Sequence, residues 1–257
     1  TFAFALAFLC SGWIGAAAQE VTGTPGSPSA TTTIDGRQIP PPPGKFGGVI
    51  NLDAPNSTSY WQPQVVPPKG APNVLVVLID DAGFGASSAF GGPCQTPAAE
   101  KHAAEGLKCN RFHTTALCSP TRQALLTGRN HHSAGMGGIT EIATGAPGYC
   151  SVLPNSISPV VRTLKLNGYS TAQFGKCHEV PCWETSPAGP YDAWPTGSGF
   201  EDFYGMLGGF NSCWQEDPFY TRWPAGRTKR VYEQGKFYAT DVFADYAIDF
   251  IGDVKLF

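Results

Sequence analysis

A continuous apolar run at residues 74–79 constrains the fold of this chain more than any other feature. The run reads Val-Leu-Val-Val-Leu-Ile and is followed directly by Asp80 and Asp81. A strand with one solvent-facing side alternates apolar and polar residues, whereas an unbroken apolar run is typical of a strand buried on both faces. We therefore expect residues 74–79 to form a central, parallel strand.

Helical patterns alternate with strand patterns along the rest of the chain. Helical periodicity with a proline or glycine at one end predicts a helix, and clustered aromatic and β-branched residues predict a strand. The predicted helices are residues 97–106, 120–127, 158–167 and 240–251, the second predicted strand is residues 169–174, and residues 229–240 are expected to form a hairpin that turns at Gln234 and Gly235. This alternation indicates an α/β layered sheet.

The composition is that of a folded domain. Of the 257 residues, 42% are hydrophobic and 14% are charged, which excludes a disordered chain and allows one sizeable core. The net charge of −3 gives no reason to expect nucleic acid as a partner. The eight cysteines leave the disulfide pairing open, because the sequence alone does not show which of them pair.

The N-terminal part differs in composition from the rest of the chain. Residues 2–18 are apolar and uncharged and end in three alanines, as in a secretory signal whose basic beginning is missing. A membrane anchor is the alternative, although about 17 residues is short for one. The following stretch is rich in proline, so residues 19–45 are expected to be extended or disordered.

These patterns predict three segments. They are a signal peptide at residues 1–18, a proline-rich entry segment at residues 19–71 and a folded domain from residue 72 to residue 257. A cleaved signal implies export, so we expect a periplasmic or secreted protein without stable membrane association.

Cys118 lies at the start of a predicted helix and is the strongest candidate for chemistry. It begins the run Cys-Ser-Pro-Thr-Arg, and a Thr-Gly pair follows the helix-forming residues. The free N–H groups and the dipole at a helix start favour anions, and Arg122 adds a positive charge one turn further on. A nucleophile at this position would face an anionic substrate. The alternative is a buried or disulfide-bonded cysteine, which is common in exported chains.

Two further groups of polar residues follow the predicted strands. Asp80 and Asp81 follow the first strand, and Lys176 and His178 follow the second. Ligands in α/β sheets gather at the carboxyl ends of strands. Adjacent carboxylates repel unless a cation lies beside them, and their oxygens favour a hard cation such as Ca²⁺ or Mg²⁺. Taken alone, each group could also be a solvated surface turn.

Together, the Cys-x-Pro-x-Arg run, the Asp-Asp pair and the Gly-Lys-x-His run closely resemble the sulfatase signature. The resemblance covers about residues 36–257 and is nearest to exported bacterial arylsulfatases of the alkaline phosphatase superfamily. It implies an α/β layered sheet with helices on both faces, and an arylsulfatase-type sulfuric ester hydrolase. In that family a formylglycine-generating enzyme oxidises the cysteine to an aldehyde, which hydrates to a diol.

The resemblance also implies roles for single residues. Arg122 would hold the hydrated formylglycine at position 118, Lys176 would bridge it to the sulfate, and His178 would hydrogen-bond its hydroxyl. These three residues and Cys118 are thus the predicted catalytic set, and a small-molecule sulfate ester is the predicted substrate.

The metal site implied by the resemblance is only partly present. Asp80, Asp81 and the modified residue 118 would bind the cation, but the Asp-Asn pair that completes the shell in the family is absent. We therefore expect a domain that is incomplete at its C-terminal side and a fragment that is inactive by itself. The alternatives are a phosphonate monoester or phosphodiester hydrolase of the same superfamily, and a non-catalytic truncated product.

Overall fold

The computed structural model describes residues 21–34, 44–216, 218, 220–225, 229–233 and 235–254. Its internal contacts divide the chain into two compact units, Thr1–Ala71 and Pro72–Phe257. The predicted signal peptide at residues 1–18 lies outside the described residues. Within the described ranges, no helix has the length and apolar character needed to cross a membrane.

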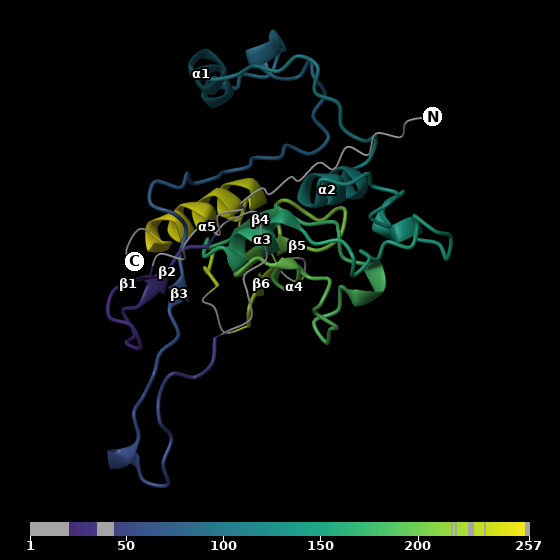
Figure 1. Cartoon of the computed structure of the whole chain (residues 1–257). Coiled ribbons are helices and arrows are strands. Elements are labelled where there is room, and N and C mark those ends of the chain that lie inside the picture. Colours follow the sequence, from purple (N-terminus) through teal and green to yellow (C-terminus); the bar gives the residue numbers. More distant parts are fainter. Residues whose placement is uncertain are drawn as a thin grey trace, which may run out of the picture. The chain divides into compact units, whose positions relative to one another are not determined.

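The first unit contains a small three-stranded sheet (Figure 1). Strand β1, Val21–Thr22, runs antiparallel to β2, Thr31–Thr32, and β2 runs parallel to β3, Gln64–Val65. A short 3₁₀ helix, η1, spans Ala54–Asn56. The proline content led us to expect no paired strands here, so this sheet is an addition to the sequence prediction. The run of four prolines lies outside the described residues.

The second unit is built on a mixed sheet in the order β4-β5-β6. Strand β4, Ala172–Lys176, is parallel to β5, Asp202–Met206, which is antiparallel to β6, Thr221–Trp223. The strand predicted at residues 169–174 therefore begins three residues later. The cause is local, because Gly168 and Tyr169 are held in the turn that ends the preceding helix.

The helices follow the sequence prediction closely. Those predicted at residues 97–106, 120–127, 158–167 and 240–251 are confirmed within a few residues, whereas the short α4 and the 3₁₀ turns were not predicted. The observed bounds are α1 Pro97–Glu105, α2 Cys118–Thr127, α3 Val160–Leu166, α4 Pro195–Ser198 and α5 Ala239–Val254, with 3₁₀ turns η2 Ser88–Phe90, η3 Thr140–Ile142 and η4 Cys182–Glu184.

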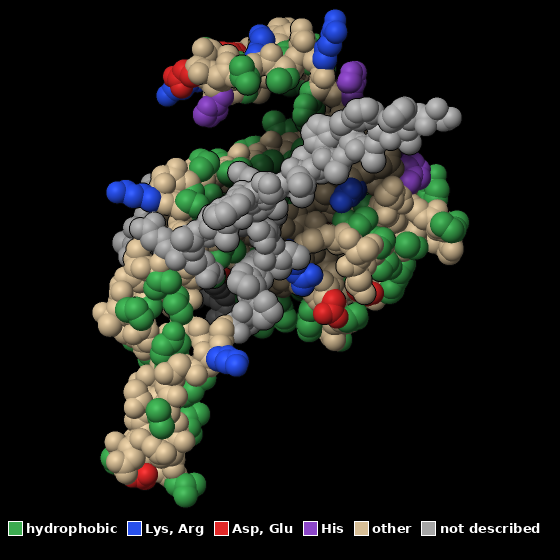
Figure 2. All heavy atoms as spheres, in the orientation of Figure 1, with side chains coloured by type: hydrophobic (Ala, Val, Ile, Leu, Met, Phe, Trp, Pro, Cys, Tyr) green, Lys and Arg blue, Asp and Glu red, His purple; other side chains and the backbone are tan. Residues whose placement is uncertain are grey.

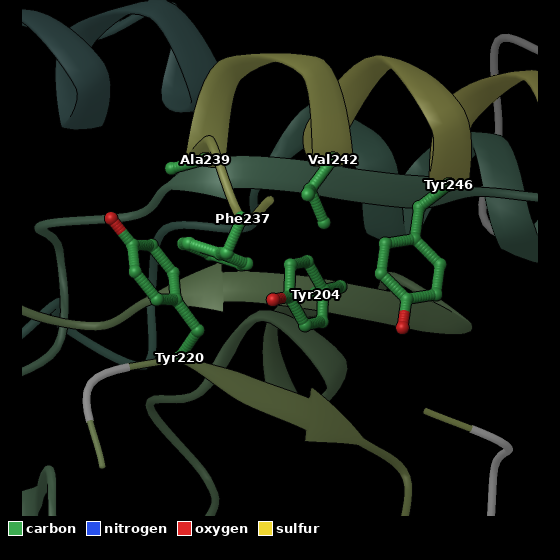
Figure 3. Packing of buried hydrophobic residues seen from close by; sticks show 6 residues of the cluster. All are labelled: Tyr204, Tyr220, Phe237, Ala239, Val242 and Tyr246. Carbon is green, nitrogen blue, oxygen red and sulfur yellow. The ribbon is translucent and has the colours of Figure 1, made fainter. Parts of the chain in front are cut away.

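Helix α5 covers one face of the sheet. Its residues Ala239, Val242 and Tyr246 recur at helical spacing and belong to one buried cluster with Tyr204 of β5. Val242 and Tyr246 point from the helix toward this strand (Figure 3). The rings of Tyr204 and Tyr246 lie 4.2 Å apart, centre to centre. This apolar face anchors the C-terminal helix on the middle strand.

The opposite face of β5 is buried as well. Phe203 points away from Tyr204, since side chains alternate along a strand. It packs with Val180, Leu207 and Trp194, the residue that precedes α4. The middle strand is therefore covered on both faces, which confirms the layered α/β architecture in the described part of Pro72–Phe257.

The predicted central strand at residues 74–79 is not formed. None of these residues belongs to a strand, and their exposed fractions lie between 40% and 76%. A strand buried on both faces needs neighbours, and no described strand pairs with this run. Its apolar side chains are therefore exposed. Figure 2 shows that hydrophobic side chains occur at many places on the visible face of the protein.

The predicted hairpin at residues 229–240 is also wrong for the described residues. The turn itself forms, because Gly235 has φ +78° and Lys236 N–H donates to Glu233 O at 2.9 Å. The flanking residues do not pair, since Phe237 packs into the core and α5 begins at Ala239. Gln234 lies outside the described residues.

A buried ion pair between two strands provides a test of the sheet. Arg222 Nη2 donates to Asp202 Oδ2 at 2.8 Å, and the two side chains are only 13% and 3% exposed. We expect Asp202→Ala to lower the free energy of unfolding by about 3 kcal/mol, because it leaves the Arg222 charge buried without its carboxylate. Urea unfolding measures this loss.

An exposed pair in the same unit serves as the control. Arg230 Nη1 lies 3.0 Å from Asp245 Oδ2, and Asp245 is 46% exposed. Asp245→Ala should therefore cost less than about 1 kcal/mol. Adding Arg222→Met to Asp202→Ala should recover most of the lost stability. Equal losses in the Asp202 and Asp245 variants would contradict this account of the sheet.

Candidate active site

Cys118 is the first residue of α2. Leu117 before it is extended, and the helix ends where Gly128 adopts φ +62° and donates its N–H to Ala124 O. Arg122 lies one turn after Cys118, on the same side of the helix. Its side chain is 9% exposed, and its Nε is buried without a hydrogen-bond partner among the described residues. The guanidinium therefore keeps an unused donor.

Two cations converge on one carboxylate beside this helix. Lys176, the last residue of β4, places Nζ 2.5 Å from Asp80 Oδ2. Arg122 Nη2 lies 3.3 Å from Asp80 Oδ1, and its Nη1 donates to the Lys176 carbonyl at 2.6 Å. Burial raises the pKa of the Asp80 carboxyl, but Lys176 and Arg122 together outweigh it and hold that pKa below its usual range. The pair of cations can therefore hold an oxyanion.

His178, two residues after the end of β4, contacts Cys118. Its Nδ1 lies 3.0 Å from Cys118 Sγ, and its Nε2 lies 2.8 Å from Glu141 Oε2. The residue is 2% exposed and has φ +54°. Burial lowers the pKa of this imidazole, and the positive charges of Lys176 and Arg122 lower it further against the opposing effect of Glu141. The surroundings of the ring therefore favour its neutral form.

The structure thus brings five of the six predicted site residues together. Asp81 is the exception, because no hydrogen bond or ion pair joins it to another described side chain. It has φ +51°, in the left-handed region. Contacts link Asp80 with Arg122 and Lys176, and Cys118 with His178. The two groups adjoin because Cys118 and Arg122 share helix α2, while Lys176 and His178 lie two residues apart.

The carboxylate oxygens at the site are of the kind that binds a hard divalent cation, but they are too few to complete its coordination shell. Asp80 and Asp81 supply carboxylate oxygens, which Ca²⁺ and Mg²⁺ prefer. However, both oxygens of Asp80 already contact cationic side chains, and the described ranges hold no group of three metal-binding side chains. A shell of about six oxygens would need further ligands. The predicted set of Asp80, Asp81 and Cys118 is therefore not assembled as a metal site by the described residues.

The two neighbouring histidines after α2 form a separate cluster. The rings of His131 and His132 lie 4.1 Å apart, and His132 Nε2 lies 3.0 Å from Tyr149 Oη. His132 thus has a hydrogen-bond partner outside the candidate site, which is typical of a structural histidine.

The aromatic residues of β5 and of the loop that follows it lie in two different environments. Phe203 and Tyr204 are buried in the two cores, whereas Phe210 and Trp214 are 87% and 70% exposed and line an open hollow with the residues between them. The hollow begins one residue after Gly209, whose N–H donates to Glu141 Oε1. An exposed aromatic lining therefore begins beside the residues that hold His178.

Sequence reasoning missed two acidic residues at this site. Glu141 contacts His178 across 37 positions of sequence, and no pattern in the chain marks it. Glu179 follows His178 directly and accepts a hydrogen bond from Cys177 Sγ at 3.8 Å. Its Oε1 is sealed from solvent without a partner among the described residues. Burial raises the pKa of Glu179 to about 8, against the attraction of Arg122.

The raised pKa of Glu179 predicts a loss of folding stability as the pH rises. Between its ordinary pKa of 4.5 and about 8, the unfolded chain gives up the Glu179 proton while the folded chain keeps it. The stability of the wild-type chain should therefore fall relative to Glu179→Gln as the pH rises through this range. Urea unfolding of both chains across the range measures this difference. Glu100→Gln, in the exposed helix α1, is the control, and a difference that stays constant with pH would contradict the prediction.

Comparison with known proteins gives a consistent result. The family model described as Sulfatase matches residues 72–255. An uncharacterised sulfatase of Schizosaccharomyces pombe is 34% identical over 154 residues, which cover 57% of this chain and 26% of that protein. An arylsulfatase of Klebsiella aerogenes is 29% identical over 184 residues, covering 67% of this chain and 37% of the relative.

A human relative is similar over a comparable length. The human N-acetylgalactosamine-6-sulfatase is 30% identical over 204 residues, covering 70% of this chain and 36% of that protein. The chain thus spans between about a quarter and just over a third of the length of these relatives. Because the family match extends over well more than half of the chain and includes all six predicted site residues, the chain belongs to the sulfatase family.

Proposed function

We propose that the whole protein hydrolyses sulfate esters at a formylglycine made from Cys118. The observation that carries this proposal is the position of Cys118 Sγ, 3.0 Å from His178 Nδ1 at the start of α2, beside two cations that converge on Asp80. An oxygen in place of the sulfur would remain within hydrogen-bonding reach of His178. The hydrated aldehyde supplies one hydroxyl for attack at sulfur and a second one for the release of sulfate.

The side chains of this chain have distinct tasks in that reaction. Lys176 and Arg122 bind the sulfate oxygens and stabilise the negative charge that develops as the alcohol or phenol leaves. His178 accepts at Nδ1 the proton of the remaining hydroxyl at position 118, so that sulfate departs and the aldehyde is restored. The exposed aromatic side chains of Phe210 and Trp214 suit an aryl leaving group.

A hard divalent cation is part of the proposal. Asp80 and Asp81 would hold it with additional ligands, and when bound it would add positive charge near the sulfate oxygens. Because these carboxylates and residue 118 supply fewer than the roughly six oxygens that such a cation needs, we expect the 257-residue chain alone to show little turnover.

A comparison of two substrates tests the proposed function. The whole protein, co-expressed with a formylglycine-generating enzyme, is assayed with an aryl sulfate and with an aryl phosphate diester. Preferential turnover of the sulfate is the expected result. Preference for the diester would instead favour the phosphonate monoester or phosphodiester hydrolases of the same superfamily. Turnover of neither substrate would favour a non-catalytic protein.

A further inference from the structure

We propose that Glu141 is a positioning residue that holds His178 in the tautomer with its proton on Nε2. The proposal rests on the proposed function, because it assigns the side chain that aims His178 at residue 118. Glu141 lies in the 3₁₀ turn η3, Thr140–Ile142, outside the signature motifs. Its carboxylate accepts hydrogen bonds from the neighbouring Thr140 hydroxyl, at 3.3 Å, from the His178 ring and from the Gly209 N–H.

The donor and acceptor chemistry of the pair determines the tautomer. An ionised carboxylate can only accept hydrogen bonds. Glu141 Oε2 lies 2.8 Å from His178 Nε2. Nε2 therefore carries the ring proton and donates a hydrogen bond to the carboxylate. In a neutral ring Nδ1 then has a free lone pair, and this lone pair faces Cys118 Sγ at 3.0 Å.

A second pair of contacts fixes the carboxylate and the ring to the same loop. Gly209 N–H donates to the other oxygen of Glu141 at 3.3 Å. The backbone N–H of His178 donates to Leu207 O at 3.1 Å. Both members of the pair are therefore tied to the loop that follows β5, which limits how far they can move apart.

The ring of His178 lies close to the backbone at Gly209. A Cβ at this position would lie 2.5 Å from His178 Cε1 and 2.8 Å from Nε2. The imidazole is itself buried, with 2% of the residue exposed. Gly209 thus limits the position of the ring, while Glu141 selects which nitrogen carries the proton.

This arrangement matters for the direction of proton transfer. With the proton on Nε2, His178 can accept a proton at Nδ1 from a hydroxyl at position 118. With the proton on Nδ1, the same nitrogen could only donate. Glu141 would therefore support the proton-accepting step without touching the substrate.

Nitrogen NMR of the 257-residue chain tests the tautomer directly. The chain has only five histidines, so uniform ¹⁵N-histidine labelling gives a simple spectrum in which His178 is assigned by its loss in His178→Ala. At about pH 8, above the ordinary histidine pKa of about 6.5, we expect a pyrrole-like Nε2 and a pyridine-like Nδ1 for His178. Glu141→Ala should move both signals toward the average of the two tautomers.

Two further variants keep the test decisive. Glu141→Gln retains the size of the side chain but offers only one acceptor oxygen for the donors of Thr140, His178 and Gly209, so it should give an intermediate shift. Glu105→Ala, at the exposed end of α1, should leave the His178 pattern unchanged. The proposal is overturned if the wild-type ring carries its proton on Nδ1, or if both Glu141 variants keep the wild-type pattern.

Kinetics of the whole protein separate this proposal from the proposed function. Loss of the Glu141 carboxylate should lower kcat by roughly 10- to 100-fold with little change in KM, as for outer residues that orient a reacting group. An inactive wild-type protein with the expected NMR pattern would refute the sulfatase activity alone. If the wild-type protein is active, and Glu141→Gln changes neither the NMR signals of His178 nor kcat, the positioning role alone is refuted.

Discussion

Replacing Cys118 by alanine is expected to lower kcat/KM of the whole protein toward an aryl sulfate by roughly 10⁴-fold or more. Alanine cannot be converted to the aldehyde, so both the attacking hydroxyl and the group that releases sulfate are lost. The loss should appear in kcat, because Lys176 and Arg122 remain in place to bind the sulfate. Steady-state kinetics after co-expression with the formylglycine-generating enzyme measures it.

Cys150→Ala is the matched control for this variant. Cys150 is partly buried like Cys118, and its thiol donates to the Val152 carbonyl at 3.6 Å. Its replacement should leave kcat/KM within about twofold, since the residue is outside the proposed site. Retention of most activity by Cys118→Ala would show that residue 118 is not the nucleophile.

Lys176→Met should lower kcat of the whole protein by roughly 10²- to 10³-fold, comparable to removal of one preorganised donor from an oxyanion site. Methionine keeps the apolar stem, so the 10%-exposed side chain still fills its place at the end of β4. Only the positive charge is lost. The pKa of Asp80 should rise in the same variant, because burial is then opposed by Arg122 alone.

Lys165→Met provides the comparison for Lys176→Met. Lys165 is an exposed residue of α3, and its replacement removes the same charge from the chain at a distance from the site residues. Kinetics and urea unfolding of both variants separate a local effect from one of net charge or stability. An equal change in kcat for the two variants would contradict the role of Lys176.

The helices could be predicted because their signals are local. The start of α2 and its end at Gly128 follow from residues within the helix itself. Strand pairing depends on distant partners, so the apolar run at residues 74–79 was predicted as a strand although no described strand pairs with it. Strand β5 was missed because Asp202 and Gly205 are poor strand formers, and their positions are explained only by Arg222 and the neighbouring backbone of β4.

The residues of the candidate site also differ in whether the sequence predicts them. Cys118, Arg122, Lys176 and His178 lie in short motifs, and the structure brings their side chains or backbone into contact. Glu141 reaches the site only because η3 and the loop after β5 fold against His178, and no spacing in the sequence encodes that contact.

The central claim is that residue 118 becomes formylglycine, and mass spectrometry of the peptide that contains it tests this claim most directly. Conversion of the thiol-bearing carbon to an aldehyde lowers the peptide mass by about 18 Da. We predict this loss after co-expression with a formylglycine-generating enzyme and its absence from Cys118→Ala. An unmodified or disulfide-bonded thiol at position 118 under the same conditions would contradict the account.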